Sequence, residues 1–224
     1  MVIGSGLLAN ALNEFESNDQ VLIFASGVSN SRETRSSEFK RECGLLRSHL
    51  DFSGLLVYIS TCSVNDASLS ETAYIRHKLQ MEKWVMSRTE DSLVFRLPIV
   101  VGRSKNKNTL INFLKNKIEL SENFLLHKNA CRHFIGYSDL KCLLPELIRD
   151  GSFVGRTVNV LTTERVSLPD VVSTMEELLE KRGTYSHVES GNCYELELSQ
   201  DVKRQPRFKL KTLKTLLLED YFLP

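Results

Sequence analysis

Short apolar runs alternate with amphipathic stretches along the first hundred residues of the chain. Four apolar runs are predicted to be strands, at residues 1–3, 21–25, 55–59 and 93–95. These runs are continuous rather than alternating in hydrophobicity, which is typical of parallel strands covered on both faces. Between them, residues 36–50 and 71–86 carry apolar side chains at helical spacing. The alternation predicts a βαβ chain.

The chain after about residue 103 is less regular, and a second, smaller lobe is expected there. Its clearest element is a helix that begins at Ser167 and ends at Gly183. A proline occupies its first turn, and two basic residues, Lys181 and Arg182, occupy its last turn. We therefore expect an α/β fold: a Rossmann-like parallel sheet with helices on both faces, a shortened N-terminal half and a small C-terminal lobe.

Composition and charge exclude several classes of function. The chain has 224 residues, of which 42% are hydrophobic and 25% charged, and its net charge is +1. This balance favours neither a nucleic-acid partner nor a membrane surface. The five cysteines contain no Cys-x-x-Cys pair and the five histidines show no metal-ligand spacing, so we expect no disulfide framework and no metal site. Without a long apolar run or a leader-like opening, a reducing cytoplasm is the expected location.

A glycine-rich turn follows the first predicted strand. Residues 4–9, Gly-Ser-Gly-Leu-Leu-Ala, fit the pattern G-x-G-x-x-[G/A], which lets the backbone approach a pyrophosphate at a helix N-terminus. The alternative is a turn needed only for packing. The acidic residue that usually follows by ~20 positions is missing, because the next strand ends in Ala25-Ser26-Gly27. Either the bound ribose is phosphorylated, or this strand is not the usual second strand.

Tyr74 and Lys78 lie one helical turn apart and so share a face of the predicted helix. A nearby ammonium favours the phenolate, which is expected to lower the pKa of the tyrosine below its usual ~10. The spacing alone decides nothing, because Tyr137 and Lys141 form a second pair. The context of the first pair differs, since it follows a buried strand that ends at Thr61, and ligands of parallel sheets bind at that edge.

Four segments occur in an order that resembles the extended short-chain dehydrogenase/reductases, and among them the nucleotide-sugar epimerases, dehydratases and reductases. The segments read YISTCSVND, YIRHK, FRLPIVVG and RHFIGYSDL. The resemblance implies that Thr61 is the catalytic hydroxyl, Tyr74 the acid/base and Lys78 its partner, and that Arg132 binds the diphosphate of the substrate. Three of these residues also have a purely structural alternative. Thr61 could cap the strand end, Lys78 could lie on a solvated helix face, and Arg132 could form a surface salt bridge.

The same resemblance implies NAD or NADP as the cofactor. Together with the glycine motif, it places the cofactor against Gly4, Gly6, Leu7, Leu8, Ala9, Ala25, Ser26, Ser60, Tyr74, Lys78 and Pro98. No metal ligand is expected. The dinucleotide-binding core is then expected over residues 1–105. Residues 106–224 are expected to complete the core and to form a small substrate-binding lobe.

The sequence departs from the family in two places, and these departures limit the sheet and the reaction that we expect. Only 57 residues separate Gly4 from Thr61, which is short for the family. The strand at residues 21–25 resembles the family's fourth strand, so a segment with the usual second and third strands is inferred to be absent. Cys62 and Ser63 stand where the 4,6-dehydratases carry an Asp-Glu pair, which disfavours dehydration.

Two functional hypotheses follow. The first is an NAD(P)-dependent epimerase or ketoreductase that acts on a nucleotide-linked sugar, as in polysaccharide biosynthesis. The second is a non-catalytic member of the same fold that binds a dinucleotide or a protein partner. The resemblance also implies a homodimer formed through the helices near 36–50 and 71–86. No nucleic acid or membrane partner is expected.

Overall fold

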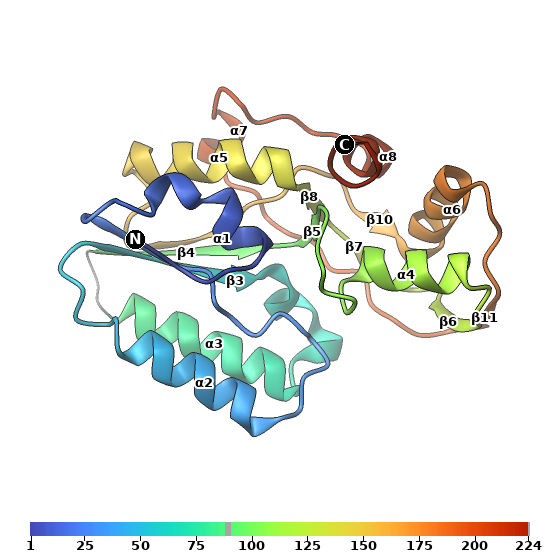
Figure 1. The fold of residues 1–224 in the computed structure, drawn as a ribbon, viewed down its shortest axis with the longest axis horizontal. Helices are drawn as coiled ribbons and strands as arrows, with labels where there is room; N and C mark the ends of the chain where they lie inside the picture. The colour runs from blue at the N-terminus through green and yellow to red at the C-terminus, as the bar shows by residue number, and fades with distance from the viewer. Residues whose placement is uncertain (88–90, 224) are drawn as a thin grey trace.

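The computed structural model describes residues 1–87 and 91–223, and its main feature is a five-stranded parallel sheet (Figure 1). The strand order is β1-β2-β3-β4-β9. The strands are β1 (Val2–Ile3), β2 (Val21–Phe24), β3 (Leu55–Thr61), β4 (Ser92–Leu97) and β9 (Arg156–Asn159). All neighbours in this sheet run parallel, which confirms the α/β class predicted from the continuous apolar runs.

Helices cover both faces of the sheet. On one face lie α1 (Leu7–Ala11) and α5 (Tyr137–Asp150), and on the other lie α2 (Ser36–Arg47) and α3 (Ala73–Met86) (Figure 1). The strand residues alternate between the two layers. Ile23 and Val57 join the apolar cluster under α1 and α5, whereas Leu22 and Leu56 join the cluster under α2 and α3. The same strands therefore supply apolar side chains to the helix layers on both faces of the sheet.

Strand β1 is an edge strand of the sheet. Within the described residues it pairs only with β2, through Val2 opposite Ile23 and Ile3 opposite Phe24. In the doubly wound order 3-2-1-4-5-6, strands 2 and 3 flank strand 1 on that side. Strands β1-β2-β3-β4 of the described sheet therefore correspond to strands 1-4-5-6 of that order, with β9 added beyond them, as expected if the strand at residues 21–25 is the equivalent of strand 4.

A smaller lobe lies at one end of the sheet (right in Figure 1). Its helices are α4 (Leu110–Glu119), α6 (Leu168–Leu179) and α8 (Leu213–Leu217). Its strands form three pairs: β5 (Ile99–Val101) with β8 (Phe134–Gly136), β6 (Phe124–His127) with β11 (Tyr185–Val188), and β7 (Cys131–Arg132) with β10 (Val166–Ser167). Leucine, isoleucine and valine side chains of α4 and α6 pack with those of α8 in a core of their own.

The end of α6 differs from the prediction. Ser167 caps the helix as expected by accepting a hydrogen bond from the Asp170 N–H, but the last helical residue is Leu179. Glu180 then adopts a left-handed conformation with φ 50°. The buried carboxylate of Glu176 binds both the Arg182 guanidinium and the Gly183 N–H. These contacts fold the predicted last turn back onto the helix.

A disulfide joins Cys131 in β7 to Cys193, whose Cα atoms lie 4.7 Å apart. The expectation of no disulfide is wrong here, because only the folding of the smaller lobe brings these two residues together across 62 positions of sequence. The described residues contain no helix long and apolar enough to cross a membrane. They also contain no group of three or more side chains able to hold a metal ion.

Replacing Cys193 by Ser is expected to lower the free energy of unfolding by about 2–4 kcal/mol, because the bond closes a long loop in the unfolded chain. Denaturant unfolding with and without a thiol reductant measures this. Cys142→Ser is the control, since Cys142 is a free and partly exposed cysteine. A reductant that leaves the stability of the wild type unchanged would contradict the prediction.

Candidate active site

The carboxyl ends of β1 to β4 meet at one edge of the sheet, where most of the predicted site residues lie. Gly4 follows β1 with φ 140°, and a Cβ there would lie 2.7 Å from the backbone oxygen of Ala25. The glycine turn therefore touches the turn that holds Ala25 and Ser26. At Gly6 a Cβ would meet no atom within 4 Å, so the space in front of this turn is open. Behind it, Leu7 and Leu8 are partly buried and Ala9 is buried.

Thr61 and Tyr74 are brought together. Thr61 is the last residue of β3, and its hydroxyl accepts a hydrogen bond of 3.1 Å from the Ser63 N–H. It therefore caps the strand end, and it lies close enough to the Tyr74 phenol to lower the pKa of that phenol. Tyr74 lies in the first turn of α3, which Thr72 caps, and its side chain is 6% exposed.

Lys78 lies one turn further along α3, facing the layer between α2 and the sheet. Its side chain is 4% exposed, so it is not on a solvated helix face. The ammonium donates to Glu42 Oε1 at 3.0 Å and to the Tyr58 hydroxyl at 3.1 Å. It lies 6.0 Å from the centre of the Tyr74 ring. The structure thus brings Lys78 near Tyr74 but pairs its charge with a carboxylate.

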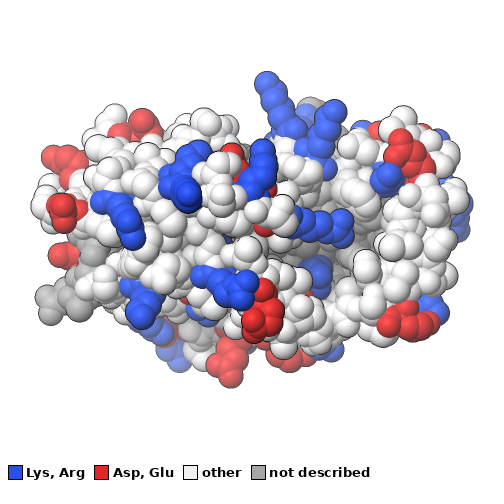
Figure 2. Space-filling model, turned by 90° about the horizontal axis from the view of Figure 1, so that it is seen from below, with Lys and Arg blue, Asp and Glu red and all other residues white. Residues whose placement is uncertain are grey.

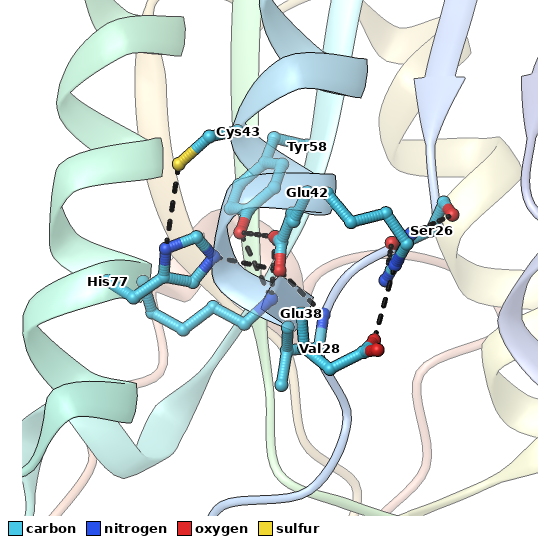
Figure 3. A network of polar contacts seen from close by, with 9 residues as sticks. Ser26, Val28, Glu38, Glu42, Cys43, Tyr58 and His77 are labelled. Atoms are coloured by element: carbon cyan, nitrogen blue, oxygen red, sulfur yellow. Dashed lines mark hydrogen bonds and ion pairs between the residues drawn. The ribbon is translucent and has the colours of Figure 1, made fainter. Parts of the chain in front are cut away.

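Glu42 is the centre of this network, which Figure 3 shows between α2, α3 and the sheet. Its carboxylate is fully buried and has four partners. They are Lys78 Nζ, the Tyr58 hydroxyl at 2.6 Å, the Val28 N–H at 2.6 Å and His77 Nε2 at 2.9 Å. Burial alone raises the pKa of Glu42. The hydrogen bond to His77, the charge of Lys78 and the bonds from Tyr58 and Val28 outweigh burial and lower the pKa to about 2.

The pKa of Tyr74 corrects the expectation from the Tyr–Lys spacing. Burial raises this pKa to about 12; the side chain of Thr61 lowers it, and the charge of Glu42 raises it further. The pKa is not pulled below its usual value, mainly because the phenol is buried, and the nearby Glu42 carboxylate, which the sequence pattern did not identify, also raises it. At neutral pH Tyr74 is a protonated phenol.

The remaining predicted residues take different positions. Ser60 points to the other face of β3 from Thr61, and its buried hydroxyl donates to Glu82. Pro98 lies between β4 and β5, next to the strand end. Arg132 lies in β7, where its guanidinium is 3.7 Å from the buried carboxylate of Asp66 and donates to the Cys131 carbonyl. Arg132 is thus a partly buried ion-pair residue that faces the loop after Thr61.

A hollow separates the sheet lobe from the lobe of α4 and α6, and basic side chains gather around it (Figure 2). The extended chain after β11 runs on the same side as the loop that follows Thr61. Asn192 donates to Asp66 at 3.2 Å, and Tyr194 lies close enough to Ser63 for that side chain to lower the pKa of its phenol. The Cys131–Cys193 disulfide holds this chain beside Arg132.

Sequence reasoning missed Glu42 and Tyr194. Glu42 carries a signal that could have been used, because a carboxylate stands between Phe39 and Leu46 on the face of α2 predicted to be apolar. Tyr194 carries none, since its neighbours are polar and far from the site in sequence.

Comparison with known proteins gives a structural match without a sequence match. No family model and no curated protein sequence matches the chain. UDP-glucuronic acid 4-epimerase from Bacillus cereus, solved with UDP-glucuronic acid and NAD, matches with a TM-score of 0.73 and 16% identity over 95% of this chain and 77% of its own. ADP-L-glycero-D-manno-heptose-6-epimerase from Helicobacter pylori matches at 0.69, with 16% identity over 96% of this chain and 76% of its own.

The dTDP-glucose 4,6-dehydratase from Bacillus anthracis, solved with NAD, matches at 0.69 with 16% identity, over 97% of this chain and 77% of its own. In each case nearly the whole chain is covered, whereas about a quarter of the known enzyme has no counterpart. The chain therefore has a shortened form of the fold of the nucleotide-sugar epimerases and dehydratases.

Proposed function

We propose that the protein is an NAD(P)-dependent epimerase or ketoreductase that acts on a nucleotide-linked sugar. The main support is that Thr61, Tyr74 and Lys78 lie near one another at the carboxyl end of the parallel strands, the same end at which the glycine turn follows β1. This arrangement occurs in a fold whose solved relatives include enzymes in complex with NAD and UDP-sugars. The proposal assigns residues 1–105 to cofactor binding and the lobe within 106–224 to the substrate.

The turn at residues 4–9 fits the pyrophosphate of such a cofactor. Gly4, Ser5 and Gly6 are exposed, and the open space at Gly6 allows a ligand to approach the backbone. Ala25, Ser26 and Pro98 would line the same edge. Since β1 is an edge strand in the described part of the chain, fewer contacts to the adenine half are available than in the doubly wound sheet. When bound, the nicotinamide would accept or supply hydride.

The proposed roles follow from the protonation and position of each side chain. Tyr74 would transfer the proton that accompanies the hydride, at a substrate oxygen that Thr61 holds by a hydrogen bond. As the phenol that it is at neutral pH it would give this proton in a reduction, and as a phenolate it would take the proton in the oxidation step of an epimerase. Lys78 would hold its positive charge near that phenol and toward the cofactor ribose. Arg132 would bind the diphosphate of the substrate, in exchange for its long contact with Asp66.

The test is to incubate the protein with NAD, NADP and their reduced forms and a panel of nucleotide sugars, and to resolve the products by chromatography and NMR. The proposal expects one sugar to be epimerised, or its keto form to be reduced. Nucleotide sugars that all remain unchanged while reduced cofactor binds would instead support the second hypothesis, a non-catalytic dinucleotide-binding member of the fold.

That second hypothesis has its own support in the edge position of β1 and in the pairing of Lys78 with Glu42. Fluorescence titration with NADH and NADPH separates its two forms. Absence of binding of either cofactor at millimolar concentration would favour a protein-interaction role, with the smaller lobe and the α2–α3 face as the surfaces to examine. The same faces of α2 and α3 are where we propose that a homodimer would form.

A further inference from the structure

We propose that Glu42 is a positioning residue of this site: it is the counter-ion that keeps the buried Lys78 ammonium charged and fixed beside Tyr74. The consequence for turnover rests on the proposed function. The charge state of Lys78 does not, and it can be measured without substrate or cofactor.

The Glu42–Lys78 ion pair is enclosed in the interior of the protein. The Glu42 and Lys78 side chains are 0% and 4% exposed, so water cannot compensate either charge. A Cβ at Gly27 would lie 2.5 Å from Lys78 Nζ and 3.1 Å from Glu42 Oε1. The ion pair is therefore packed directly against the turn after β2, at a glycine.

The Glu42 carboxylate is held by more than one independent hydrogen bond on each oxygen. One oxygen receives Lys78 and the Tyr58 hydroxyl, and the other receives the Val28 N–H and His77. These donors come from α3, from β3 and from the turn after β2. The Glu42 carboxylate is thus held by donors from three elements (Figure 3). Because it is held in this way, its ion pair with Lys78 fixes the position of the ammonium.

Burial and several charged groups act together on the ammonium of Lys78. Burial lowers the pKa of Lys78, and the charge and hydrogen bond of Glu42 oppose burial. Among the weaker charges, Glu82 on the same helix acts with Glu42, whereas Arg41 on α2 acts against it. His77 lies on the opposite side of the carboxylate. Without Glu42, a neutral Tyr58 hydroxyl would be the hydrogen-bond partner left to the ammonium among the bonds described.

The direct test is NMR titration of the protein labelled with ¹³C at lysine Cε, with Lys78→Met used to assign the signal. Lys78 is expected to remain an ammonium throughout the neutral range in the wild type. In Glu42→Gln its titration midpoint is expected to fall by about 1–3 pH units, because the opposite charge is gone while burial remains. Glu42→Asp, which restores the charge, is expected to recover most of the shift.

Two comparison variants separate charge from packing. Glu38→Gln removes a partly exposed carboxylate one turn earlier in α2 and should leave the Lys78 midpoint unchanged. Tyr58→Phe removes the neutral partner and should move the midpoint less than Glu42→Gln does. A wild-type Lys78 that is already neutral near pH 7, or an equal midpoint in wild type and Glu42→Gln, would overturn the proposal. If Glu42→Gln does not fold, the titration midpoint of Lys78 in the wild type still tests the proposal.

Turnover provides a second readout. If the ammonium is needed, kcat/KM of Glu42→Gln should fall on the alkaline side at the lowered Lys78 midpoint, whereas a loss of folding alone would lower it equally at all pH values. If no nucleotide sugar is turned over by the wild type, the proposed function fails while the titration still tests Glu42.

Discussion

Replacing Tyr74 by Phe is expected to lower turnover of the nucleotide sugar by about 10²–10⁴-fold, the usual contribution of a positioned proton donor. The variant removes one oxygen from a residue that is 6% exposed and leaves the apolar packing of its ring with Val28 and Ile75 in place. Thr61 keeps its hydrogen bond from the Ser63 N–H. The fold should therefore survive while the proton donor is lost.

The chain provides a matched control for this experiment. Tyr137 and Lys141 repeat the spacing of Tyr74 and Lys78, but Tyr137 begins α5 and packs in the cluster between α1 and the sheet. Tyr137→Phe should retain nearly full turnover. Binding of reduced cofactor, followed by fluorescence, should be similar in both variants and the wild type. Equal turnover by Tyr74→Phe and the wild type would refute the assigned role of Tyr74.

The sheet could be predicted because its strands are buried on both faces. Such strands read as unbroken apolar runs, and each of the four predicted in the first half is present. The strand ends also placed Thr61 near Tyr74, since parallel strands bring their carboxyl ends to one edge. Even the edge position of β1 follows from the short distance in sequence between Gly4 and Thr61.

What could not be predicted depends on contacts between distant segments. The local Tyr–Lys spacing gave the wrong direction for the pKa of Tyr74, because the fold buries the phenol and places the Glu42 carboxylate near it. Glu42 also pairs the charge of Lys78 from another helix, 36 positions away. The partner of Cys131 is likewise fixed only by folding of the smaller lobe. Helix α5, which contains Pro145, has no counterpart in the prediction, because a proline inside an apolar pattern ordinarily indicates a helix end.

The buried Glu42–Lys78 ion pair should have a large effect on the free energy of unfolding. Lys78→Met removes the cation and leaves the Glu42 carboxylate buried without its ionic partner, which is expected to cost about 3–5 kcal/mol in the free energy of unfolding. Lys83→Met, an exposed lysine on the same helix, should change it by less than about 0.5 kcal/mol. Denaturant unfolding at neutral pH measures both. A Lys78→Met protein as stable as the wild type would show that the pair contributes nothing.

The contribution of Glu42 to the free energy of unfolding should decrease as the pH falls. The pKa of Glu42 is about 2 in the folded protein against an ordinary 4.5. The stability from its charged form is therefore fully present above pH 4.5 and is lost as the pH falls toward 2. Lys78→Met removes a group that depresses this pKa, so its stability should fall less steeply with acid than that of the wild type. In the double variant Glu42→Gln/Lys78→Met no charge is left unpaired, and most of the stability lost in Lys78→Met should return. A double variant that loses the sum of both single losses would mean that the two side chains act independently.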